Sequence, residues 1–288
     1  MNIPINLSLH TKIKTYENGN AIYFDSISDV YRLIIEEYYL PKYTNTVFLC
    51  TPCYPHFAFD GSTFVRNEDI SQYKHKIFCN FDHYNFESYM NGIFDWCMDL
   101  HIDEIWEWQI NIMNKYPEDL KDLVKFMPVR YISKYEQFAI TLKDPVYLFA
   151  FCGNIGEYRM SVLEQYTSQY APIKVLCGIR YLNNTKEFEN CACVFNIHYH
   201  PDNYQEQLRI CEFLSLNIPV VSEASDINYF GNLVPEITPD EIGKLYIKLR
   251  NNEIIIPENP AQKYKALTHT DEAFEKYRKN LLEYHRII

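Results

Sequence analysis

Short apolar runs alternate with longer amphipathic segments along nearly the whole chain. Strand-length apolar runs lie at residues 21–24, 46–50, 76–79, 104–108, 125–129, 146–151, 173–177, 193–197 and 219–222. Helical patterns separate them at residues 28–39, 85–99, 110–123, 157–170, 185–191, 204–216 and 239–250. Apolar strands that alternate with amphipathic helices are typical of α/β proteins with mostly parallel sheets. We therefore predict an α/β fold.

A polar stretch interrupts this alternation between residues 134 and 145 and ends in Pro145. The simplest architecture is two doubly wound, Rossmann-like domains that face a cleft, over residues 1–142 and 143–270. A charged helix over residues 271–288 follows and could cross back to the first domain. Ligands of such sheets bind at the carboxyl ends of the strands, so polar residues just after each strand are the candidates for function.

Residues 194–223 form the most informative segment, because they predict a strand, a polar loop, a helix and a second strand. The loop contains His198 and Tyr199, and the helix carries Arg209 and Glu212. Backbone N–H groups at a helix N-terminus favour an anionic ligand. This segment therefore predicts an anion site with a cation and a carboxylate nearby.

A second turn could join this site. Gly153 and Asn154 follow the strand at residues 146–151, and Arg159 lies in the next helix. A tight turn there would bring backbone amides close to a phosphate, and Arg159 would add positive charge. The turn matches neither common glycine-rich phosphate motif, so an ordinary connection between strand and helix is the alternative.

Two glutamates of the 204–216 helix have competing interpretations. Glu206 lies three residues after Asn203, which resembles a capping box and explains Glu206 structurally. Glu212 lies deeper in the helix, where it could pair with Arg209 or accept hydrogen bonds from two ribose hydroxyls. Cys191, Cys193, His198 and His200 also resemble a zinc set, but strand alternation places the cysteines and the histidines on opposite faces.

Several polar side chains follow strands of the first half. His56, Asp82 and His83 could each act as a general base near a cleft. Cys50 and Cys53 have the spacing of a redox pair, but the prolines around them favour an extended loop over the helix that such sites need. Buried thiols are the simpler interpretation.

Composition narrows the class of protein. The formal net charge of −11 and the scattered lysines and arginines argue against a nucleic-acid partner. The sequence contains no apolar run of membrane-spanning length and no secretory signal at its start. We therefore expect a soluble cytoplasmic protein whose nine cysteines are thiols.

Three segments resemble a known family: NIHY at residues 196–199, EQLRICE at residues 206–212 and PVVSE at residues 219–223. Together they are similar to the C-terminal domain of GT-B glycosyltransferases, in particular the bacterial and viral family 1-like sequences. Residues 145–223 carry this resemblance. It implies a nucleotide-sugar donor, an unidentified glycan, lipid or protein acceptor with a hydroxyl group, and no metal or other cofactor.

The resemblance also implies residue roles. Glu212 would bind the donor ribose, Gly153, Asn154 and Arg159 would face the diphosphate, and His198 and Tyr199 would approach the donor. Arg209 would join Arg159 in stabilising the leaving diphosphate, and a base of the first domain would activate the acceptor. Retaining members often have a glutamate where this chain has Tyr204, and the glycine-rich loop of the first domain is absent. A non-catalytic subunit that binds nucleotide sugars is therefore the alternative function.

Overall fold

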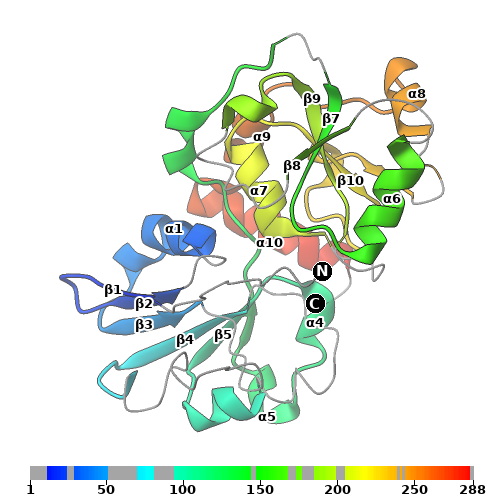
Figure 1. Ribbon diagram of the computed structural model, residues 1–288. Coiled ribbons are helices and arrows are strands. Elements are labelled where there is room, and N and C mark those ends of the chain that lie inside the picture. The colour runs from blue at the N-terminus through cyan, green and yellow to red at the C-terminus, as the bar shows by residue number, and fades with distance from the viewer. Residues whose placement is uncertain are drawn as a thin grey trace, which may run out of the picture. The chain divides into compact units, whose positions relative to one another are not determined.

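The computed structural model describes residues 12–24, 29–50, 70–80, 94–143, 147–167, 173–176, 185–198, 205–238, 241 and 244–285. By its internal contacts the chain forms two compact units, Met1–Val129 with Leu282–Ile288, and Arg130–Leu281. The division falls after Val129, earlier in the chain than the polar stretch that predicted a boundary. Each unit contains a mostly or wholly parallel sheet (Figure 1).

The sheet of unit 1 follows chain order, β1-β2-β3-β4-β5-β6. Only β1 runs antiparallel to its neighbour, and the other pairs are parallel. The strands are β1 (Lys12–Thr15), β2 (Ala21–Phe24), β3 (Thr46–Leu49), β4 (His75–Asn80), β5 (Glu104–Glu107) and β6 (Val124–Phe126). The central strands β3 and β5 are buried along nearly their whole length, which is why the sequence shows them as continuous apolar runs.

Helices cover both faces of this sheet (Figure 1). The ring of Tyr39, which follows α1, lies 4.7 Å from that of Trp106 on β5. The opposite face packs against a cluster that includes Ile112, Tyr116 and Leu120, from α4 to α5. The helices are α1 (Asp29–Tyr38), α4 (Ile110–Met113) and α5 (Glu118–Lys121), with a 3₁₀ turn η1 (Leu40–Lys42). One helix was predicted over residues 110–123, but Pro117 divides that stretch into two short helices.

The sheet of unit 2 is parallel throughout, in the order β11-β10-β9-β7-β8. Its strands are β7 (Tyr147–Cys152), β8 (Ile173–Leu176), β9 (Cys191–Asn196), β10 (Val220–Glu223) and β11 (Glu236–Ile237). Its helices are α6 (Glu157–Thr167), α7 (Gln207–Ser215), α8 (Leu245–Arg250), α9 (Pro260–Thr268) and most of α10 (Asp271–Tyr284), whose last residues from Leu282 belong to unit 1. Its 3₁₀ turns are η2 (Ser133–Phe138), η4 (Thr185–Phe188) and η5 (Gly231–Leu233). None of the described helices is long and apolar enough to cross a membrane.

Helices cover both faces of the second sheet as well. Val162, Leu163 and Tyr166 of α6 pack with Leu245 of α8 on the face that carries Phe195. α7 lies on the other face, because its Arg209 contacts Asn196, the next residue along β9. Both units are thus α/β layers with helices on both sides of the sheet, which confirms the predicted fold class.

The strand order of unit 2 reverses direction at β7 and β9. The chain leaves β7 through α6 toward β8, and it leaves β9 through α7 toward β10 on the other side. The two connections diverge, so the carboxyl ends of β7 and β9 form a topological switch point (the crevice). Crevices of this kind are the usual ligand sites of open α/β sheets.

Candidate functional site

The turn after β7 forms one wall of the crevice. Gly153 has φ +147°, a backbone conformation that side chains rarely permit. A Cβ at this position would lie 3.1 Å from Nη2 of Arg209 and 3.5 Å from Nη1 of Arg159. The backbone angle therefore favours glycine here, and an added Cβ would also require the guanidinium group of Arg209 to shift by a few tenths of an ångström.

Arg159 extends from the first turns of α6 to the end of β9 and is almost completely buried, with 1% of its side chain exposed. Its Nε donates to the carbonyl oxygens of Ile197 (3.1 Å) and His198 (3.2 Å). Its Nη1 donates to the carbonyl oxygen of Asn154 at 2.8 Å. Arg159 thus joins the turn after β7 to the loop after β9 and fixes both walls of the crevice.

Arg209 reaches the same place from α7. Its Nη1 donates to Oδ1 of Asn196 at 3.4 Å, and its Nη2 donates to Oε1 of Glu206 at 3.1 Å. Glu206 also pairs with Nη2 of Arg159, so one carboxylate bridges two guanidinium groups. Of the two arginines, Arg209 is the more accessible, with 14% of its side chain exposed.

The predicted capping role of Glu206 is wrong. α7 begins at Gln207, and the side chain of Glu206 makes no capping hydrogen bond to the helix. The carboxylate faces the two arginines because their paired positive charge attracts it more strongly than a backbone N–H does. Asn203, the proposed partner in the cap, lies outside the described residues.

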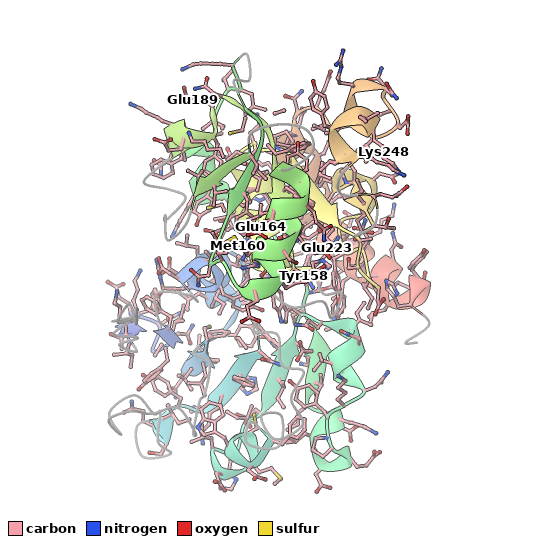
Figure 2. The ribbon with its side chains drawn as sticks, turned by 45° about the vertical axis from the view of Figure 1, so that its right-hand side comes forward. Tyr158, Met160, Glu164, Glu189, Glu223 and Lys248 are labelled. Atoms are coloured by element: carbon pink, nitrogen blue, oxygen red, sulfur yellow. The ribbon has the colours of Figure 1, made fainter. Side chains whose placement is uncertain are left out.

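A buried carboxylate lies beside this cluster at the end of β10. Glu223 accepts hydrogen bonds from the hydroxyl of Tyr158 on α6 and, at 3.0 Å, from the backbone N–H of His198. Figure 2 shows Tyr158 and Glu223 close together at the end of α6. Burial raises the pKa of Glu223, and the hydrogen bonds and Arg159 oppose that shift. The sequence pattern placed this glutamate at a strand end but assigned it no role.

His198 contributes mainly through its backbone. Its ring is buried, with Nδ1 3.7 Å from Oε2 of Glu223. Glu212 lies near the C-terminal end of α7, where its Oε1 accepts a hydrogen bond from the hydroxyl of Tyr135 at 3.0 Å. The structure therefore brings Gly153, Asn154, Arg159, His198 and Arg209 together. The ribose-binding role of Glu212 remains a prediction.

Other candidates from the sequence fall outside the described residues, namely His56, Asp82, His83, Tyr199, His200 and Cys53. Cys50 is a buried free thiol, which agrees with the simpler interpretation, and its pairing with Cys53 is untested because Cys53 lies outside the described residues. Cys191 and Cys193 are free and buried. Among the residues that the structure describes, no group of three or more histidine, cysteine, aspartate or glutamate side chains could hold a metal ion.

Unit 1 contains a polar cluster that the sequence pattern did not predict. Glu107, at the end of β5, is fully buried and accepts hydrogen bonds from Nδ2 of Asn80 (2.6 Å), the hydroxyl of Tyr116 (2.9 Å) and the backbone N–H of Gln109 (2.9 Å). Burial raises the pKa of Glu107 to about 7, against the effect of these hydrogen bonds. Its position at a strand end was the available signal, but the apolar run around it favoured a purely structural interpretation.

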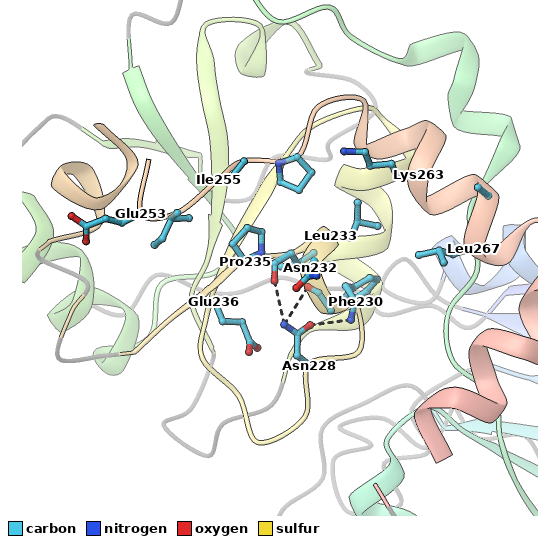
Figure 3. Close-up of a pocket in the computed structure, with 15 residues that line it drawn as sticks. Asn228, Phe230, Asn232, Leu233, Pro235, Glu236, Glu253, Ile255, Lys263 and Leu267 are labelled. Atoms are coloured by element: carbon cyan, nitrogen blue, oxygen red, sulfur yellow. Dashed lines mark hydrogen bonds between the residues drawn. The ribbon is translucent and has the colours of Figure 1, made fainter. Parts of the chain in front are cut away.

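A pocket of about 1030 Å³ lies beside β11, the edge strand of unit 2 (Figure 3). Its walls include Phe230, Leu233 and Ile255, and the side chain of Ile255 is 74% exposed. Two of its polar side chains accept hydrogen bonds from nearby residues: Asn228 accepts from the backbone N–H of Phe230 at 3.0 Å, and Glu236 accepts from the hydroxyl of Ser225 at 2.6 Å. These polar groups are already satisfied within the protein.

Comparison with known proteins finds similarity among solved structures. No family model and no curated protein matches the sequence. Among solved structures, the chain is similar to one described as the crystal structure of an α1,3-fucosyltransferase. The similarity covers 89% of this chain and 84% of that chain, with 14% sequence identity and a TM-score of 0.44.

Proposed function

We propose that the protein is a glycosyltransferase that moves a sugar from a nucleotide-sugar donor to a hydroxyl group of an acceptor. The observation that carries this proposal is the convergence of Arg159 and Arg209 on Gly153 at the crevice between β7 and β9. Two guanidinium groups beside a glycine turn and a helix N-terminus suit a diphosphate, which carries its charge on two neighbouring groups.

The two arginines would have different roles in binding the donor. Arg209 is the more exposed and would contact the diphosphate directly. Arg159 is held by hydrogen bonds to backbone carbonyl oxygens and would add positive charge from a more buried position. Negative charge grows on the diphosphate as the bond to the sugar breaks, so prepositioned cations would stabilise the transition state more than the ground state. The proposed reaction requires no metal ion, because arginines and backbone dipoles would supply the stabilisation.

The resemblance of residues 145–223 to GT-B glycosyltransferases supports a sugar-nucleotide over another diphosphate. Glu212 would accept hydrogen bonds from the donor ribose, and His56, Asp82 or His83 would be the base that activates the acceptor. The sugar, the nucleoside and the acceptor are left open by this proposal.

A second candidate is a subunit that binds nucleotide sugars without transferring them. Two observations favour it. Arg159 is saturated by protein carbonyls and by Glu206, and Tyr204 stands where retaining members of the resembled family often have a glutamate.

The two candidates differ in turnover. A thermal-shift panel of UDP-, GDP-, ADP- and dTDP-sugars would first identify a stabilising donor, which both candidates predict. Hydrolysis or transfer of that donor would then be followed by release of the free nucleoside diphosphate. Turnover supports the transferase, whereas stabilisation without turnover supports the binding subunit. If no sugar nucleotide stabilises the protein, both candidates fail.

A further inference from the structure

We propose that the carboxylate of Glu206 occupies the position of a donor phosphate and must be displaced when the donor binds. This inference rests on the proposed function. Glu206 would compete with incoming anions for the two arginines, so only an anion that binds tightly enough would displace it. Weakly bound anions, such as inorganic phosphate, would be excluded by the same contact.

The geometry of Glu206 is that of a bound anion. One oxygen, Oε1, accepts from Nη2 of Arg209 at 3.1 Å and also from Nη2 of Arg159, and the other oxygen contacts Nη1 of Arg209. Carboxylates and phosphates use the same planar fork of a guanidinium group. A phosphate placed between the two arginines would therefore need the same N–H donors that Glu206 now uses.

Each arginine also has partners other than Glu206. Arg159 donates to the carbonyl oxygens of Asn154, Ile197 and His198, and those bonds remain if Glu206 leaves. Arg209 keeps its bond to Asn196 and its packing against the turn after β7. Removal of the Glu206 carboxylate thus leaves a preformed pair of guanidinium groups. An incoming anion then binds more tightly, because it no longer has to displace the carboxylate.

Glu206 itself is placed where displacement is feasible. It is the residue that immediately precedes α7, and its side chain makes no capping bond to that helix. Its side chain is 12% exposed, compared with 1% for Arg159. Rotation of one side chain toward solvent would clear the position without any movement of the sheet or the helices.

Isothermal titration with inorganic pyrophosphate tests the inference, because this probe carries the part that all candidate donors share. Glu206→Gln should bind pyrophosphate about tenfold more tightly than the unchanged protein, since the competing charge is gone. Glu157→Gln is the matched control. Glu157 lies exposed in the first turn of α6, so its replacement changes the net charge equally but should change the affinity less than about twofold.

The outcomes separate this inference from the proposed function. Weaker or equal binding to Glu206→Gln overturns the inference, because Glu206 would then position the arginines or have no influence. If a nucleoside diphosphate binds the unchanged protein but not more tightly to the variant, only the inference fails. If neither protein binds pyrophosphate or any nucleoside diphosphate, the proposed function fails as well. Circular dichroism and a second variant, Glu206→Ala, check that the result does not come from misfolding.

Discussion

Gly153→Ala should damage both the stability of unit 2 and its affinity for anions. At φ +147° a residue with a Cβ is strained, which costs about 2 kcal/mol. The new Cβ would also lie 3.1 Å from Nη2 and 3.2 Å from Cζ of Arg209, so the guanidinium must move by a few tenths of an ångström. That movement would weaken its hydrogen bonds to Asn196 and Glu206, at a further cost of about 1 kcal/mol.

Gly231→Ala provides the matched control. Gly231 also has a positive φ, +52°, but an added Cβ would meet no atom within 4 Å. Its replacement should therefore cost only the backbone penalty, about 1 kcal/mol. The expected difference between the two variants combines about 1 kcal/mol of additional backbone strain at Gly153 with about 1 kcal/mol from the close approach of Arg209 to the turn.

Urea unfolding gives the free energies, and calorimetric titration with pyrophosphate gives the affinities. We expect Gly153→Ala to lose about 2 kcal/mol more than Gly231→Ala and to bind pyrophosphate at least about fivefold more weakly. Gly231→Ala should bind like the unchanged protein. If both alanine variants lose the same stability and keep the same affinity, the turn after β7 does not shape the anion site.

Three further predictions test other parts of the structure. Arg130→Met should destabilise unit 2 by about 3 kcal/mol in urea unfolding, because the buried carbonyl oxygen of Thr268 and the partly buried one of His269 lose the hydrogen bonds that Arg130 donates. Lys265→Met, which removes an exposed ion pair and a contact of the ammonium group with the ring of Tyr131, should cost only about 1 kcal/mol. In the folded protein burial raises the pKa of Glu107 from its ordinary value of 4.5 to about 7. The unfolded chain therefore loses this proton at a lower pH than the folded protein does, and the free energy of unfolding falls by about 3 kcal/mol as pH rises from about 4.5 through about 7. Glu107→Gln should remove that part of the pH dependence, and an unchanged difference between pH 4.5 and pH 8 would contradict the assignment. If Glu212 binds ribose, Glu212→Gln should weaken the binding of a nucleoside diphosphate but not that of pyrophosphate. A nucleoside diphosphate that binds the variant and the unchanged protein equally well would exclude that role.

The sequence predicted the buried strands well because their apolar runs are long and bounded by polar segments. It missed β1 and β11 for a physical reason. β1 is exposed along its whole length, and β11 has only two residues, so neither shows an apolar run. Both lie at sheet edges, where one side of the strand has no neighbour to require apolar residues.

Helix boundaries depended on proline in ways that the pattern of apolar residues did not resolve. The prolines of residues 254–263 favour an extended stretch when the sequence is taken alone, yet α9 begins at Pro260. Proline is favoured in the first turn of a helix, where its missing N–H costs no hydrogen bond. Pro117, in contrast, precedes α5 and ends the preceding helical stretch.

The site could be predicted in part because its members lie at strand ends. Gly153, Arg159, His198 and Arg209 were identified from their positions after β7 and β9, and the structure brings them together. The pairing of Glu206 with Arg159 could not be predicted, because the two residues lie 47 positions apart in the sequence and only the order of the strands in the sheet brings them together. Local sequence favoured a helix cap, and a long-range ion pair replaced it.

The central claim is that the crevice between β7 and β9 binds a nucleoside diphosphate through Arg209. Calorimetric titration of UDP, GDP, ADP and dTDP into the unchanged protein and into Arg209→Met tests it most directly. We expect at least one of the four to bind the unchanged protein, and Arg209→Met to weaken that ligand at least about tenfold, since a charge-assisted hydrogen bond is lost. Binding of none of the four, or equal affinity in the variant, would contradict the claim.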